Sequence, residues 1–190
     1  MRKSKKPIRI GLISGSTREG SINKQLVRAV SHVFKDMGAK PVKISLKDYP
    51  MPIYDGDWEA ANGIPPTVKK LIRRIKNCDG VFISTPEYNG GLPALLKNTI
   101  DWTTRIELGH FKGPIYGIGA TTPGAMSGIM AMRELHFILN RLGAQVVPAQ
   151  VGTGFAAKAF NSKGRLVEGF SHNQAQLMAS QMLTLIKQRR

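Results

Sequence analysis

The stretch IRIGLISGSTREGSIN, residues 8–23, decides how this chain folds. Its first part, residues 8–14, is an almost unbroken run of apolar, β-prone residues and predicts a buried strand. Residues 15–23 are small and polar, and they lead into a segment whose apolar residues recur at helical spacing from Leu26 to Met37. A strand that passes through such a loop into a helix is typical of a parallel α/β sheet.

The same succession of strand, loop and helix recurs along the rest of the chain. Strands are expected at residues 8–14, 41–46, 80–85, 114–120 and 144–148, and helices at residues 26–37, 67–77, 93–104, 127–141 and 169–187. The strands that begin at Ile8, Gly80 and Pro114 are nearly continuous in apolar residues, as central strands covered on both faces are. These patterns predict one α/β domain, residues 1–190, with a five-stranded parallel sheet and helices on both faces. Residues 1–7 are expected as a flexible basic tail.

Two stretches are expected as irregular surface connections. Residues 47–66 contain four prolines, and residues 150–168 separate the last expected strand from the last helix. The second stretch includes the pattern G-x-G-x-x-A at residues 152–157. Because it lies after the last expected strand, with no strand to follow and complete a βαβ unit, we interpret it as a chance match to a dinucleotide fingerprint.

Composition excludes several classes of protein. Hydrophobic residues make up 42% of the chain and charged residues 21%, which is a globular balance. The apolar runs are far too short to cross a membrane, and the N-terminal residues do not have the form of a signal peptide. The single cysteine, Cys78, excludes an internal disulfide, and the four histidines have no metal-ligand spacing. A cytoplasmic protein with no membrane segment and no metal is expected.

The chain is strongly basic. Its 28 Lys and Arg residues against 12 Asp and Glu residues give a formal net charge of +16. Such a charge favours an anionic ligand or nucleic acid as a partner. Aromatic residues are few and are not interleaved with the basic runs, so no nucleic-acid partner is expected.

Ligands of open α/β sheets bind at the carboxyl ends of the central strands. Three loops follow such strands here, at residues 15–23, 85–93 and 120–128. The first combines glycines, hydroxyls, a helix N-terminus and Arg18, which together suit a phosphate. It matches neither the Walker A pattern nor G-x-G-x-x-G, so a monophosphate is favoured over a nucleoside triphosphate or a dinucleotide. The alternative is structural, with Ser21 capping the helix and Gly15 turning the chain.

The second loop, TPEYNGGLP at residues 85–93, places an aromatic ring, an amide and two glycines in one connection. That composition suits a flat heterocycle, with Tyr88 as an apolar face. The alternative is a plain turn with Pro93 at the first helical position. The third loop is rich in hydroxyls and glycine, and it is weak evidence when taken alone.

Two segments, SGSTREGSINKQL and STPEYNGGLPALLKNTIDW, resemble the signature stretches of the NADPH-dependent FMN reductase family, and most of all its bacterial chromate and quinone reductase branch. The resemblance implies a flavodoxin-like fold, FMN as the cofactor, and NADPH or NADH as the co-substrate. It further implies ping-pong hydride transfer from NAD(P)H to FMN and on to quinones, with chromate and azo compounds as further acceptors. A homodimer or homotetramer is implied as well. No catalytic side chain is expected, because the flavin carries the chemistry.

The resemblance also assigns the binding residues. It places the FMN phosphate at Ser16, Arg18, Ser21, Ile22 and Asn23, the isoalloxazine ring at Pro86, Glu87, Tyr88, Asn89 and Gly90, and a third contact at Thr121, Thr122 and Gly124. One alternative from another functional class stays open at this point. A flavodoxin-type electron carrier would have the same fold and cofactor without nicotinamide turnover.

Overall fold

The computed structural model describes residues 6–190, so most of the expected basic tail lies outside the described residues. The strands are β1 (Arg9–Ser14), β2 (Lys40–Ile44), β3 (Gly80–Ser84), β4 (Ile115–Thr121), β5 (Gln145–Val146) and β6 (Val151–Thr153). The helices are α1 (Ile22–Asp36), α2 (Gly56–Asn62), α3 (Pro66–Lys76), α4 (Ala94–Thr104), α5 (Gly109–Lys112), α6 (Ile129–Arg141), α7 (Ala156–Ala159) and α8 (Phe170–Gln188), with a short 3₁₀ helix at Leu46–Asp48. The sheet is parallel, in the order β2-β1-β3-β4-β5.

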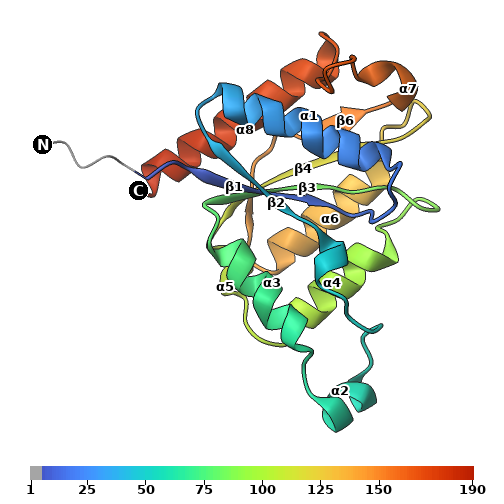
Figure 1. Cartoon of the computed structure of the whole chain (residues 1–190), viewed down its shortest axis with the longest axis vertical. Coiled ribbons are helices and arrows are strands. Elements are labelled where there is room, and N and C mark those ends of the chain that lie inside the picture. Colours follow the sequence, from blue (N-terminus) through green and yellow to red (C-terminus); the bar gives the residue numbers. More distant parts are fainter. Residues whose placement is uncertain (1–5) are drawn as a thin grey trace, which may run out of the picture.

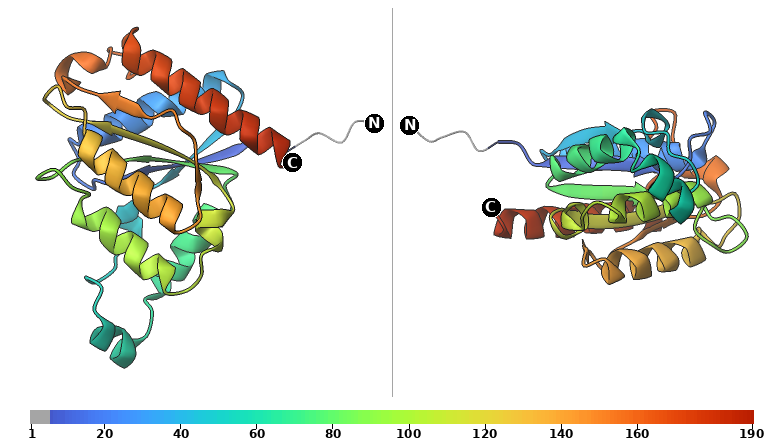
Figure 2. Two further views of the ribbon diagram at one scale, coloured as in Figure 1. Left: turned by 180° about the vertical axis from the view of Figure 1, so that it is seen from behind. Right: turned by 90° about the horizontal axis from the view of Figure 1, so that it is seen from below.

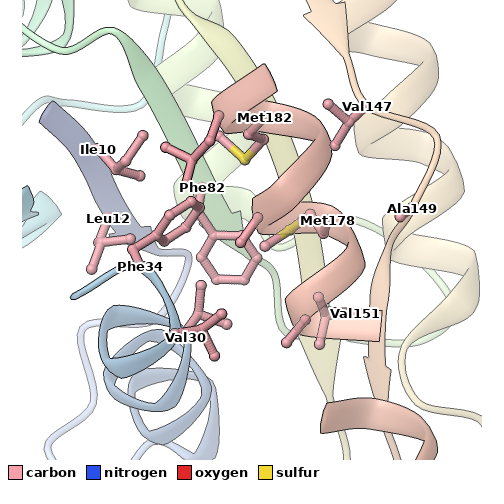
Figure 3. Packing of buried hydrophobic residues seen from close by; sticks show 14 of the residues in the cluster. Ile10, Leu12, Val30, Phe34, Phe82, Val147, Ala149, Val151, Met178 and Met182 are labelled. Carbon is pink, nitrogen blue, oxygen red and sulfur yellow. The ribbon is translucent and has the colours of Figure 1, made fainter. Parts of the chain in front are cut away.

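Helices cover both faces of the sheet, as expected (Figure 1). On one face, α1 and α8 pack over the central strands, and Phe34, Phe82 and Met178 are fully buried between them (Figure 3). A Cβ atom at Gly117 of β4 would lie 2.7 Å from the sulfur of Met178, so this glycine lets α8 pack directly onto the strand. On the other face, a second core joins the sheet to α3, α4 and α6 through residues such as Leu71 and Leu135.

The sheet has six strands, and the prediction of five was wrong. The edge expected at residues 144–148 consists of two short strands. β5 lies within the expected range, β6 lies beyond it, and both pair with β4. The edge segment of residues 145–151 is two residues longer than residues 115–119 of β4, which it faces. Pro148 lies in that segment and has no N–H to donate to the ladder, which explains the interruption.

Both stretches expected to be irregular contain regular elements. Residues 47–66 carry α2, which projects from the body of the molecule (Figure 2). Asp55 caps α2 by accepting the backbone N–H of Trp58 at 2.8 Å. The rings of Tyr54 and Trp58 pack edge-on against Trp102 of α4, with centroids 5.1 and 5.7 Å away. Residues 150–168 contain β6 and α7, so Gly152 of the G-x-G-x-x-A pattern lies within a strand and not after the last one.

None of the helices among residues 6–190 is long and apolar enough to span a membrane. The parallel register aligns the carboxyl ends of the central strands, because Ser14 of β1 pairs with Ser84 of β3, and Ser84 pairs with Gly119 of β4. The loops that follow β1, β3 and β4 therefore leave the sheet at one edge.

Candidate functional site

Main-chain hydrogen bonds hold together the starts of the three loops singled out in the sequence. The N–H of Gly15 donates to the carbonyl of Ser84 at 2.8 Å, and the N–H of Thr85 donates to the carbonyl of Gly119 at 2.8 Å. Arg18 and Tyr88 belong to the first two of these loops. The expectation that the loops share one edge of the sheet is confirmed.

Asn23, at the start of α1, holds the three loops together through its side chain. Its amide oxygen accepts the hydroxyl of Ser84 at 2.7 Å and the backbone N–H of Thr121 at 3.2 Å. Its amide nitrogen donates to the carbonyl of Thr121 at 3.1 Å. The residue is only 2% exposed. These bonds use both acceptor positions of the amide oxygen and one of the two amide N–H groups, and the backbone N–H of Asn23 stays available to a ligand.

The first loop supplies the features of an anion site. Ser21 is the N-cap of α1 in extended conformation and is buried, but its hydroxyl makes no capping bond. Among the described residues, the backbone N–H groups of Ile22 and Asn23 have no acceptor, as is usual for the first turn of a helix. Arg18 is exposed and has no ion-pair partner within residues 6–190. These donors, at the positive end of a 15-residue helix, fit a monophosphate.

The second loop is a minimal β-hairpin. Tyr88 and Gly91 exchange backbone hydrogen bonds of 3.2 and 3.1 Å, and Asn89 and Gly90 between them have φ values of +53° and +76°. Positive φ at both central positions is the signature of a type I′ turn, for which Asn-Gly is the preferred sequence. The ring of Tyr88 stands beside this turn and is 58% exposed. The hairpin thus offers an aromatic face and several backbone groups at the sheet edge.

Two carboxylates fasten this hairpin to α6. Glu87, which precedes the turn, accepts the backbone N–H groups of Met130 and Ala131 at 2.9 and 3.1 Å. Glu134, in the next turn of α6, accepts the N–H of Leu92 at 2.6 Å. The carboxylate of Glu87 therefore lies at the N-terminus of α6, where the helix dipole stabilises it. One oxygen of this carboxylate is held by α6, and the main chain of Glu87 stays available to the predicted ring site.

The third loop brings hydroxyls to the same edge. The hydroxyl of Thr121 is buried and has no hydrogen-bond partner among the described residues. The hydroxyl of Thr122 donates to the carbonyl of Gly124 at 3.0 Å. A buried hydroxyl without a partner is costly, so Thr121 favours a bound polar group at this edge.

Three residues of the site were not predicted from the sequence. Ser84 is the polar end of an otherwise apolar strand, and this position is the one signal that would have indicated its bond to Asn23. The ammonium of Lys24 donates to the carbonyl of Thr17 at 2.7 Å and brings a second cation to the first loop. Glu134 carries no sequence signal, because its partner is a backbone N–H 42 residues away in the chain.

The protein has a parallel sheet in the strand order of flavodoxins. A helix N-terminus suited to a phosphate follows one strand, and a hairpin suited to a flat ring follows the neighbouring strand. These features define a flavodoxin-like mononucleotide-binding protein. Comparison with known families gives a more specific result. The profile of the NADPH-dependent FMN reductase family matches residues 8–158. The chain belongs to this family of flavin-dependent oxidoreductases.

Individual relatives agree with this assignment. The chain is 34% identical over 143 residues to a quinone reductase of Escherichia coli K12, an alignment that covers 74% of this chain and 73% of the relative. It is 32% identical over 174 residues to an NAD(P)H-dependent FMN reductase of Pseudomonas aeruginosa, which covers 90% and 91% of the two chains. Among solved structures, the flavoenzyme NAD(P)H:(acceptor) oxidoreductase FerB of Paracoccus denitrificans superposes with a TM-score of 0.78 at 24% identity, over 95% of this chain and 98% of that one. At this identity the structural likeness supports the flavodoxin-like fold.

The residues present fit FMN. For the phosphate, the first loop has two backbone N–H groups, a serine hydroxyl that makes no capping bond, and two cations. For the flavin, the hairpin has an aromatic ring and a glycine. At the same edge, the buried hydroxyl of Thr121 has no hydrogen-bond partner among the described residues. The assignment of individual FMN contacts to the thirteen predicted residues stays a prediction.

Proposed function

We propose that this chain is an FMN-dependent NAD(P)H oxidoreductase that reduces quinones. When bound, FMN supplies the redox chemistry, which is the transfer of a hydride from NAD(P)H and of two electrons, with protons, to a quinone that becomes a hydroquinone. The observation that carries the proposal is the convergence of the three loops through Asn23, within a chain that belongs to a reductase family.

The protein's own contributions are binding and orientation. Arg18, with Ser16, Ser21 and the N–H groups of Ile22 and Asn23, holds the phosphate. The main chain of the hairpin, from Pro86 to Gly90, faces the polar edge of the flavin and stabilises the negative charge that reduction places there. Tyr88 excludes water from one side of the ring. Thr121, Thr122 and Gly124 complete the wall of the site.

Further features of the proposal follow the relatives. The quinone reductases among them favour quinones as the acceptor of this chain too. Chromate and azo compounds are proposed as further anionic or aromatic acceptors. We also propose that residues 1–190 form one FMN-binding domain, that the assembly is a homodimer or homotetramer, and that the protein is cytoplasmic.

The test is an anaerobic titration of the purified, FMN-loaded protein with NADPH and with NADH. The reductase is expected to lose its yellow colour within the mixing time and to regain it when benzoquinone is added. A protein that binds FMN but keeps its colour with both nucleotides would be an electron carrier. A protein that binds no FMN would contradict the proposal at its first step.

A further inference from the structure

A second pocket lies beside the third loop, outside the predicted FMN contacts. It has a volume of about 260 Å³ and is formed by the end of β6, by α7 and by the segment that leads into α8. The polar, charged and aromatic side chains among its lining residues are those of Thr153, Phe155, Lys158, Glu168, Phe170 and Ser171. Figure 1 places α7 at the same end of the sheet as the loops after β1, β3 and β4.

The pocket is tied to the third loop by main-chain bonds. Thr122 donates its N–H to the carbonyl of Thr153 at 3.1 Å, and Phe155 donates its N–H to the carbonyl of Gly124 at 3.1 Å. A Cβ atom at Gly154 would lie 2.9 Å from that same carbonyl oxygen, so only glycine fits between the two segments. The segment that forms the pocket is therefore in direct contact with the loop that forms the predicted wall of the FMN site.

Phe155 is held in a strained conformation. Its φ of +47° lies in the left-handed region, which bulky residues rarely adopt. Its side chain is nevertheless 61% exposed, so burial of the ring does not compensate for the strain. Strained residues of this kind cluster at binding sites. Phe170, which also lines the pocket, is 75% exposed.

The other groups of the pocket are polar. Lys158 is exposed at the rim. Thr153 is 1% exposed, and its hydroxyl has no hydrogen-bond partner among the described residues. Glu168 adds a carboxylate that can accept hydrogen bonds from amino or hydroxyl groups. Two open aromatic faces, an ammonium and unpaired polar groups suit a planar aromatic ring that carries both a phosphate and hydrogen-bond donors.

We propose that this pocket binds the adenosine end of NADPH, with the adenine ring against Phe155 and Phe170 and the 2′-phosphate at Lys158. The inference rests on the proposed function, because NADPH must reach a flavin on the other side of the third loop. The G-x-G-x-x-A stretch at residues 152–157 then has a role, since it builds the strained turn that presents Phe155. Lys158 discriminates NADPH from NADH, which lacks the 2′-phosphate.

Calorimetric titration of the FMN-loaded protein tests the pocket without turnover. The probes are adenosine 2′,5′-bisphosphate and AMP, which differ in the 2′-phosphate alone. We expect the bisphosphate to bind more tightly, and Lys158→Gln to weaken it about tenfold with little effect on AMP. Phe155→Asn removes the ring while keeping a residue that tolerates positive φ, and it should weaken both probes about tenfold, as should Phe170→Ser. Lys163→Gln, an exposed charge change nearby, is the matched control.

Steady-state kinetics provide the second arm. Lys158→Gln should raise the KM for NADPH and leave the KM for NADH unchanged, whereas the two phenylalanine variants should raise both. If the wild-type protein does not bind the bisphosphate, or if the Lys158 and Phe155 variants bind it as well as wild type does, the inference is wrong. A change confined to FMN affinity or to oligomeric state would also overturn it, by assigning the pocket to the cofactor or to a subunit contact.

These results are distinguishable from failure of the proposed function. If wild-type flavin is reduced by NADPH while the pocket variants behave normally, the function stands and the pocket assignment falls. If NADPH does not reduce the wild-type flavin at all, the proposed function itself fails.

Discussion

Glu134 reaches from α6 to the loop after β3 and accepts the backbone N–H of Leu92 at 2.6 Å. Together with Glu87, which runs in the opposite direction to the start of α6, it fixes both ends of the Asn89-Gly90 hairpin. A hairpin of this size is not stable by itself. The conformation of the predicted flavin loop therefore depends on a helix that touches it from outside the site.

The first prediction concerns the hydrogen bond from Leu92 to Glu134. Glu134→Ala should weaken FMN binding about fivefold, because an exposed hydrogen bond to a carboxylate is lost and the hairpin gains freedom. Glu134→Gln keeps an acceptor for Leu92 and should retain most of the affinity. Quenching of FMN fluorescence on titration of the apoprotein measures both. Glu107→Gln, which removes a carboxylate next to Lys76 far from the hairpin, is the control. Equal affinity in the alanine variant and in wild type would show that the hairpin needs no brace.

Arg18→Ala is expected to weaken FMN by about ten- to a hundredfold, since a charge-assisted bond to the phosphate contributes roughly 1.5–3 kcal/mol. Riboflavin, which lacks the phosphate, should bind the variant and the wild type equally. The same fluorescence titration, run with both flavins, gives the comparison. Arg73→Ala, an exposed arginine on α3, controls for net charge. Unchanged FMN affinity would remove Arg18 from the site.

A third prediction concerns Asn23. Asn23→Ala leaves the hydroxyl of Ser84 and the main chain of Thr121 without their buried partner, so the free energy of unfolding should fall by about 2–3 kcal/mol. Ser84→Ala should cost about 1 kcal/mol. The double variant should lose less than the sum, because both changes break the same bond. Urea denaturation of the apoprotein measures all three. Strict additivity would mean that the Asn23–Ser84 bond contributes nothing.

The fourth prediction is a loss of stability in acid. His110 is fully buried, and neither ring nitrogen has a hydrogen-bond partner among the described residues. Burial lowers the pKa of His110 from 6.5 to about 4, a shift that Lys76 increases and Glu107 opposes. Between these two pH values the unfolded chain binds a proton that the folded chain does not. The free energy of unfolding should therefore fall by roughly 3 kcal/mol as the pH drops from about 6.5 to 4.

The measurement for His110 is urea denaturation at several pH values. His110→Leu should remove this part of the pH dependence, while the titrations of the carboxylates remain in both proteins. His172→Gln, at a half-buried position in the first turn of α8, serves as the control histidine change. If the leucine variant loses stability in acid as steeply as the wild type does, His110 is not the responsible group.

The sequence was sufficient for the order of β1 to β5 and of the five longer helices, and for the edge of the sheet that carries the loops. The apolar runs of β1, β3 and β4 are long and are buried on both faces, so periodicity located them well. The edge strand was harder to predict, because one proline divides it. A short strand that follows such a break has the sequence pattern of a loop. Helix α2 was missed because four prolines surround it, although Asp55 is an N-cap signal.

The contacts within the site could be predicted only in part. Sequence patterns placed Arg18, Tyr88 and Thr121 in the three relevant loops. They could not show that the side chains of Asn23 and Glu87 bond to protein groups, because those partners lie 61 and 43 residues away in the chain. The strain at Phe155 also left no signal, since the backbone conformation of a single aromatic residue depends on its tertiary contacts.

Pro148 divides one border of the sheet, and Pro41 lies in β2 at the other. A strand from another molecule needs an unbroken row of N–H and C=O groups to join a sheet, and proline interrupts that row. The exposed lysines of β2, Lys40 and Lys43, add charge that an incoming strand would have to desolvate. Crowded copies of this protein are thus less prone to fibril-like growth by addition of strands at these two borders.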